Sequence, residues 1–188
     1  MKLITTPRPT NDQVAGREAI HSGLPWIVPE SLVELEALMK PDMRIFEWGA
    51  GGSTMYWLKH NACVTTLERK CRWYFWTRER AKELPGKLDI VFIPMGGKAD
   101  EDYANAIKGF DDATFDLVYV DGEAPQRGTS LKAAVSKIKP GGILLLDNSN
   151  WYKTDWLQNE WNETRWQTIE YEWLGKPMVW ATSIFWRK

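Results

Sequence analysis

Three glycines followed by two hydroxyl side chains form the stretch of this sequence best suited to hold a nucleotide-like ligand. The stretch is Glu47-Trp-Gly-Ala-Gly-Gly-Ser-Thr54, and it follows a short apolar run that begins at Arg44. Glycines let the backbone adopt positive φ angles and let a ligand approach closely, because no Cβ atom stands in the way. Ser53 and Thr54 can cap a helix. The order predicts a strand, a glycine turn and a helix start.

The acid at the start of this stretch indicates the kind of ligand. A dinucleotide-binding loop uses a third glycine for close packing of helix on strand, and this chain has Thr54 at that position. The Glu47 carboxylate would repel a diphosphate and attract an ammonium group. A cationic ligand without phosphate groups therefore fits the loop better than a nicotinamide dinucleotide.

A second constellation of oxygen-bearing side chains follows two later apolar runs. Asp121 ends one run, and Asp147 with Asn148 ends the next. If both runs are adjacent parallel strands, their carboxyl ends meet at one edge of a sheet. Carboxylate and amide oxygens suit Mg²⁺ or Ca²⁺, and a carboxylate can also act as a general base.

The elements that would position these residues alternate between strand and helix. Helices are expected at residues 30–39, 54–59, 71–84, 101–108, 129–138 and 154–163, and strands at 44–48, 63–67, 88–94, 115–121, 142–147, 166–173 and 178–186. Residues 1–24 are expected to form a flexible N-terminal arm with one short helix near 12–21, and residues 25–188 a single domain. This alternation predicts an α/β fold with a mostly parallel sheet.

Four segments, in order, resemble the class I S-adenosylmethionine-dependent methyltransferase family. Glu47–Thr54 resembles its motif I, and Val64-Thr-Thr-Leu-Glu68 resembles its second strand with the ribose-binding acid at the end. Phe115-Asp-Leu-Val-Tyr-Val-Asp-Gly122 and Lys139-Pro-Gly-Gly-Ile-Leu-Leu-Leu-Asp147 resemble its fourth and fifth strands. The resemblance covers roughly residues 25–150. It implies a Rossmann-like, doubly wound seven-stranded sheet, mostly parallel with an antiparallel C-terminal hairpin, in a single methyltransferase domain.

The resemblance also implies which residues contact the cofactor, S-adenosyl-L-methionine. Glu68 would accept hydrogen bonds from the ribose hydroxyls, and it lies about 20 residues after the glycine loop, where nucleotide folds place such an acid. Trp73 could pack on the adenine ring or in the core. The expected cofactor-binding residues are Trp26, Glu47, Gly49, Gly51, Ser53, Thr54, Glu68, Arg69, Trp73, Gly97, Lys98 and Asp121.

The acceptor side resembles the metal-dependent O-methyltransferases that act on catechols and caffeoyl esters, with one departure. The shared pattern is Asp121 followed by Asp147-Asn148, which in those enzymes binds a metal ion. They also carry a catalytic lysine three residues after the first aspartate, where this chain has Ala124. Two interpretations stay open: a Mg²⁺ or Ca²⁺ site at Asp121, Asp147 and Asn148, or an Asp121 beside the cofactor and an Asp147-Asn148 pair that only turns the chain.

Methyl transfer to a hydroxyl needs a base or a metal ion. Asp121 is the first candidate for the catalytic base. His21 is the second, because the loop after it could fold over the cofactor, although a surface histidine is the alternative.

Three residues near the expected ligand edge are candidates for acceptor binding: Arg127, Asn148 and Trp151. Arg127 is expected on a loop, where its planar guanidinium could clamp an anionic acceptor or pair with Glu123 or Asp147.

Composition excludes few partners but argues against some. The 188 residues carry 24 basic and 25 acidic side chains with no basic stripe, so nucleic acid is a poor candidate partner. The chain has neither a leader pattern nor an apolar run of roughly 20 residues, so we expect a cytoplasmic protein without membrane contact. Cys63 and Cys71 are expected to be free thiols. The 12 tryptophans are expected to serve the core, a homo-oligomer surface or an aromatic platform for a sugar or aryl acceptor.

The leading functional interpretation is a methyltransferase that acts on a hydroxyl, or on an amine, of a small molecule or glycan precursor. One alternative is an NAD-dependent oxidoreductase on a similar sheet, which Glu47, Thr54 and the lack of a Tyr-x-x-x-Lys pair disfavour. The other is a non-catalytic cofactor-binding module, which Ala124 in place of a lysine keeps open.

Overall fold

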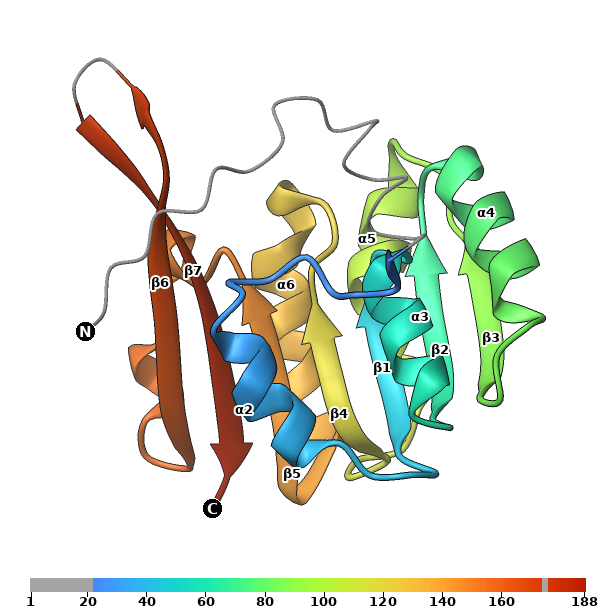
Figure 1. Cartoon of the computed structure of the whole chain (residues 1–188), viewed down its shortest axis with the longest axis horizontal. Coiled ribbons are helices and arrows are strands. Elements are labelled where there is room, and N and C mark those ends of the chain that lie inside the picture. Colours follow the sequence, from blue (N-terminus) through green and yellow to red (C-terminus); the bar gives the residue numbers. More distant parts are fainter. Residues whose placement is uncertain (1–21, 174–175) are drawn as a thin grey trace.

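The computed structural model describes residues 22–173 and 176–188. His21, the expected helix near 12–21 and most of the expected N-terminal arm lie outside the described residues. The described chain forms a central sheet with helices on both faces (Figure 1).

The sheet has seven strands in the order β3-β2-β1-β4-β5-β7-β6. The strands are β1 Arg44–Trp48, β2 Cys63–Glu68, β3 Lys87–Phe92, β4 Phe115–Val120, β5 Ile138–Asp147, β6 Trp161–Trp173 and β7 Lys176–Arg187. β1 to β5 pair in parallel, whereas β7 is antiparallel to both β5 and β6. The expected doubly wound sheet with an antiparallel C-terminal hairpin is therefore confirmed.

Five α-helices of the described part of the chain cover the two faces. They are α2 Ser31–Leu38, α3 Gly52–Lys59, α4 Cys71–Ala81, α5 Lys98–Asn105 and α6 Ala124–Ala134. Successive side chains of a strand point to opposite faces, so in β1 Ile45 packs in the core under α2 to α4 and Phe46 packs in the core under α5 and α6 (Figure 1). Because both faces are covered, every residue of β1 after Arg44 is buried, and β4 is apolar apart from Asp116.

Two predicted elements are wrong. The helix expected at 129–138 begins earlier, at Ala124, because Pro125 suits the first turn of a helix and Gly128 is tolerated inside it. Residues 154–163 do not form a helix: a short 3₁₀ turn at Asp155–Leu157 leads directly into β6, where Trp161 is buried. The pairing of β6 with β7 outweighs the local helical pattern there.

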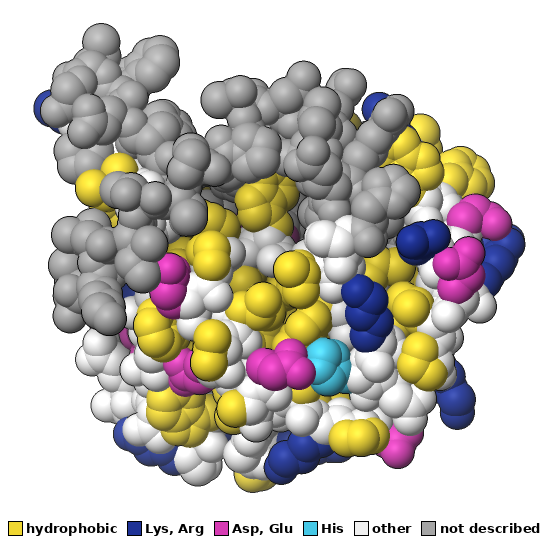
Figure 2. All heavy atoms as spheres, viewed as in Figure 1, with side chains coloured by type: hydrophobic (Ala, Val, Ile, Leu, Met, Phe, Trp, Pro, Cys, Tyr) yellow, Lys and Arg dark blue, Asp and Glu magenta, His cyan; other side chains and the backbone are white. Residues whose placement is uncertain are grey.

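The tryptophans divide between core and surface. Trp48, Trp57, Trp161 and Trp180 are buried, whereas Trp151 and Trp156 are exposed. On the face seen in Figure 2, basic, acidic and hydrophobic side chains are interspersed, and the described residues there form no continuous basic patch. No helix in the described ranges is long and apolar enough to cross a membrane. Self-association through the exposed tryptophans stays a prediction.

Deletion of residues 164–188 is expected to make the protein aggregate. β7 lies between β5 and β6, and its Trp180 Nε1 and Thr182 Oγ1 donate to Asp147 Oδ1 at 2.8 and 3.1 Å. Removing β7 leaves the edge of β5 unpaired and exposes the core beside it. The measurement is the soluble fraction after expression, with removal of Lys188 alone as the control. A soluble, monomeric truncated chain would contradict this account of the tail.

Candidate functional site

A cleft of about 440 Å³ opens at the carboxyl ends of the parallel strands. Its volume is typical of small-molecule sites. Among the predicted site residues, those lining it are Trp26, Gly49, Gly51, Ser53, Glu68, Arg69, Trp73, Asp121, Arg127, Asn148 and Trp151. The cleft walls do not include Glu47, Thr54, Gly97, Lys98 or Asp147. The structure thus brings most of the predicted residues together at one edge of the sheet.

The glycine turn brings the ends of three strands close together. Gly49 has a φ of +94°, and a Cβ atom there would lie 3.3 Å from the carbonyl oxygen of Asp121. Its N–H donates to Leu67 O at 2.8 Å. A larger residue there would be strained by the positive φ and crowded against the Asp121 carbonyl, so glycine suits this turn directly before α3 begins.

Glu47 supports this turn from below. Its carboxylate accepts hydrogen bonds from Ser53 Oγ and Thr54 Oγ1, both at 2.5 Å, and from Trp57 Nε1 at 3.1 Å. The side chain is fully buried, and this burial raises its pKa from 4.5 to about 7 against the opposing effect of the hydrogen bonds. The structure therefore gives Glu47 the role of fixing the start of α3, and its expected contact with a cofactor ammonium group stays a prediction.

The raised pKa of Glu47 predicts that stability falls as the pH rises. Between pH 4.5 and about 7 the folded protein keeps this proton while the unfolded chain has lost it. Unfolding then releases a proton, so the folded state loses up to about 3 kcal/mol across this window. The measurement is urea unfolding from pH 5 to 8, with E47Q as the control because glutamine does not titrate. Equal pH dependence in both proteins would contradict the raised pKa.

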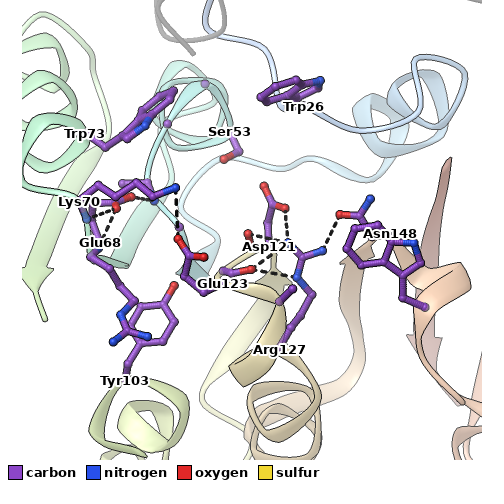
Figure 3. Close-up of a pocket in the computed structure, with 18 residues that line it drawn as sticks. Trp26, Ser53, Glu68, Lys70, Trp73, Tyr103, Asp121, Glu123, Arg127 and Asn148 are labelled. Atoms are coloured by element: carbon purple, nitrogen blue, oxygen red, sulfur yellow. Dashed lines mark hydrogen bonds and ion pairs between the residues drawn. The ribbon is translucent and has the colours of Figure 1, made fainter. Parts of the chain in front are cut away.

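Glu68 is held at the end of β2 by backbone groups. Its Oε2 accepts from Ala50 N at 2.9 Å, and its Oε1 accepts from Arg69 N at 2.7 Å and Lys70 N at 2.6 Å (Figure 3). Burial raises the pKa of Glu68, whereas these N–H donors lower it. The side chain is only 6% exposed but forms part of the cleft wall. A fixed carboxylate in this position can accept hydrogen bonds from ligand hydroxyls.

Among the cleft residues that were not predicted as site residues from the sequence, Lys70, Tyr103 and Glu123 make side-chain contacts with other cleft residues. The Lys70 ammonium lies 3.2 Å from Glu123 Oε1, and this ion pair links the two sides of the cleft (Figure 3). The ring of Tyr103 in α5 packs against the Arg69 guanidinium, whose Cζ atom lies 4.8 Å from the ring centroid. The position of Lys70, directly after Glu68 and Arg69, is a signal that could have identified it, whereas nothing in the sequence marks Tyr103.

Replacing Gly122 with alanine is expected to destabilise the cleft. A Cβ atom there would lie 2.3 Å from Tyr103 Oη and 3.0 Å from Trp48 Cβ. Overpacking of this kind costs about 1–3 kcal/mol. The measurement is urea unfolding, and Y103F added to G122A should recover part of the loss because the closest contact disappears. If G122A were as stable as wild type, the cleft around Gly122 would have room for a methyl group, which would contradict this prediction.

Arg127 lies in the first turn of α6, not on the expected loop. Its side chain is buried. Its guanidinium donates hydrogen bonds to three backbone oxygens, Asp121 O, Gly122 O and Asp147 O, and to two side-chain oxygens, Asp121 Oδ1 and Asn148 Oδ1. It therefore pairs with the Asp121 carboxylate and not with Glu123. Burial and the nearby Asp147 raise the pKa of Asp121, and Arg127 opposes this effect. Binding of an anionic acceptor by Arg127 stays a prediction. The N–H groups of Arg127 that would bind it already donate to oxygens of the protein.

These contacts do not fit a metal centre. Asp147 Oδ1 accepts from Trp180 and Thr182, and Asn148 Oδ1 accepts from Arg127 at 2.7 Å. Among residues 22–173 and 176–188, no group of three or more His, Cys, Asp or Glu side chains could hold a metal ion. The predicted Mg²⁺ or Ca²⁺ site is therefore not supported, because Arg127 occupies the space between the oxygens. Asn148 has a φ of +50°, consistent with the interpretation that Asp147-Asn148 turns the chain.

The cleft does fit an adenosine-containing cation. Glu68 offers acceptors for ribose hydroxyls, and Trp73 and Asp121 add an aromatic surface and a negative charge.

Comparisons with known proteins support the fold. No protein-family model matches this chain, and no curated protein matches it. An O-methyltransferase from Bacillus cereus, solved with S-adenosylhomocysteine, is similar with 18% identity and a TM-score of 0.61 over 98% of this chain and 94% of that chain. The O-methyltransferase TomG from Streptomyces achromogenes, solved with S-adenosylmethionine, has 17% identity and a TM-score of 0.65 over 97% and 92%.

A third similar structure is a precorrin-6y C5,15-methyltransferase from Geobacter metallireducens. It has 15% identity and a TM-score of 0.52 over 87% of this chain and 91% of that chain. At such identities the likeness concerns the fold. The chain therefore has the class I S-adenosylmethionine-dependent methyltransferase fold that its sequence resembles.

Proposed function

We propose that this protein is an S-adenosylmethionine-dependent methyltransferase that methylates a hydroxyl oxygen of a small molecule or glycan precursor. The observation that carries the proposal is one cleft with an acidic side chain and a tryptophan in each of its two halves. Glu68 and Trp73 line one half, and Asp121 and Trp151 line the other. Similar folds solved with S-adenosylmethionine or S-adenosylhomocysteine support the choice of cofactor.

The Glu68 half would bind the cofactor. When bound, the cofactor supplies an electrophilic methyl group on a positively charged sulfur. Glu68 would accept hydrogen bonds from the ribose, and Trp73 would cover the adenine. The Asp121 carboxylate, which lines the same cleft, would favour the positive charge.

The Asp121 half would bind the acceptor. The Asp121 carboxyl group points into the cleft below Ser53 and Trp26 (Figure 3). Trp151 is 59% exposed and offers a flat surface of the kind on which sugars and aryl rings pack. Arg127 pairs with Asp121, and Lys70 pairs with Glu123, so the charges of these four residues cancel. A neutral polyhydroxyl or aryl alcohol therefore suits this half better than an anion.

Asp121 would act as the general base in its ionised form, which the ion pair with Arg127 favours against the burial that raises its pKa. It would take the proton of the acceptor hydroxyl while the oxygen gains the methyl group and the methyl–sulfur bond breaks, which would leave neutral S-adenosylhomocysteine as the second product. Holding both partners in one cleft also orients the oxygen for in-line attack. An amine acceptor would use the same geometry.

The test is transfer of isotopically labelled methyl groups to a panel of aryl alcohols, sugars and amines. The proposal predicts label on a hydroxylated compound and stoichiometric S-adenosylhomocysteine. Tight S-adenosylmethionine binding without transfer to any member would favour the non-catalytic module. We also propose that the protein is located in the cytoplasm.

A further inference from the structure

The guanidinium of Arg127 lies where the oxygens at the ends of β4 and β5 converge. Its Nη1 donates to Asn148 Oδ1 at 2.7 Å and to Asp147 O at 2.9 Å, and its Nη2 donates to Asp121 Oδ1 at 3.1 Å. Nε and Nη2 also donate to Gly122 O at 3.0 and 2.8 Å. All three guanidinium nitrogens therefore bind oxygens, which compensates the cost of burying the charge.

This set of oxygens comes from the residues expected from the sequence to hold a divalent ion. A carboxylate, an amide oxygen and a backbone carbonyl are typical ligands of Mg²⁺ and Ca²⁺. Here they face a side chain that keeps its charge at every accessible pH. A metal ion could bind them only if Asp121 and Asn148 released Arg127.

We propose that Arg127 takes the place of a divalent metal ion and positions the acceptor half of the cleft. It holds the Asp121 carboxyl group toward the cleft, fixes Asn148 and supplies a permanent positive charge beside the reacting oxygen. Methyl transfer then needs no divalent ion. The inference rests on the proposed function, but its main test does not require the acceptor or the cofactor.

The first experiment measures the thermal unfolding of wild type and R127A in Mg²⁺, Ca²⁺ or Mn²⁺ alone. Wild type is expected to show no saturable shift, because its oxygens already bind the guanidinium. R127A is expected to unfold at a lower temperature without metal and to gain a saturable rise of about 2–4 °C with one of these ions. Adding D121N to R127A should abolish this rise, because the charged ligand is lost.

A second measurement does not depend on R127A being folded. The paramagnetic resonance signal of free Mn²⁺ should remain unchanged when wild type is added, since no site removes the ion from solution. Binding of one Mn²⁺ per wild-type chain would overturn the proposal. A folded R127A that shows no metal-dependent shift would overturn it as well.

An activity measurement separates a positioning role from general support of the fold. Added guanidinium ion should restore part of the methyl transfer lost in R127A but none of that lost in D121N, and excess EDTA should leave the wild-type rate unchanged. A wild type that loses activity in EDTA would overturn the proposal. Failure of wild type to bind S-adenosylmethionine would instead refute the proposed function, while the metal titrations would still decide the role of Arg127.

Discussion

Replacing Asp121 with asparagine is expected to lower the rate of methyl transfer by about 10²–10⁴-fold, with a much smaller loss of cofactor affinity from the missing charge. The carboxylate is the group at the floor of the cleft that can take a proton, and Arg127 holds its Oδ1 at 3.1 Å. Asparagine keeps an oxygen that can accept this hydrogen bond, so the change removes the base and leaves the positioning. The measurement is the rate of S-adenosylhomocysteine formation together with the dissociation constant for S-adenosylmethionine.

The matched control is D116N. Asp116 lies in the same strand, β4, but at its opposite end, where its carboxylate accepts from Arg44 N and Lys139 Nζ at 2.8 Å each. This change should alter stability only slightly and leave the rate near that of wild type. A D121N protein with the wild-type rate would show that another group takes the proton.

Replacing Glu68 with alanine is expected to weaken cofactor binding about a hundredfold or more. Hydrogen bonds to a charged acceptor contribute about 1.5–3 kcal/mol each, and the ribose would offer two hydroxyls. For wild type, S-adenosylmethionine at a hundredfold excess over its dissociation constant should add about 2.7 kcal/mol of stability, which E68A should mostly lose. The measurements are thermal shift and titration calorimetry.

E68Q separates ribose binding from support of the loop. Alanine also leaves the N–H groups of Ala50, Arg69 and Lys70 without their acceptor. Glutamine keeps one oxygen for them, so E68Q should have an intermediate affinity and near-normal stability in the absence of ligand. An unchanged ligand-induced shift in E68A would mean that the ribose site lies elsewhere.

The sequence predicts the sheet well, and it predicts that the glycine loop and Glu68 line one cleft, because those signals are local. The parallel strands are apolar runs bounded by turns, and the glycines of the loop follow β1 directly. The position of Glu68 at the end of β2 also follows from short-range order. Each of these features depends on neighbours in the chain or on the alternation of strands and helices.

The acceptor half is less predictable because its contacts join distant segments. Asp121, Asp147 and Asn148 have the residue types of a metal site, and only the fold shows that Arg127 reaches between them. That arrangement depends on α6 beginning at Ala124, a start that Gly128 and the polar residues around it conceal. Trp161 is a second example. It was expected in a helix, but it is buried in β6, because pairing with the distant strand β7 decides its conformation.

The central claim is that this cleft binds S-adenosylmethionine. Titration calorimetry of the full-length chain with S-adenosylmethionine, and separately with NAD, tests it most directly. The account predicts saturable binding of one S-adenosylmethionine per chain, weakened in E68A, and no saturable heat with NAD. Saturable binding of NAD together with no binding of S-adenosylmethionine would contradict it.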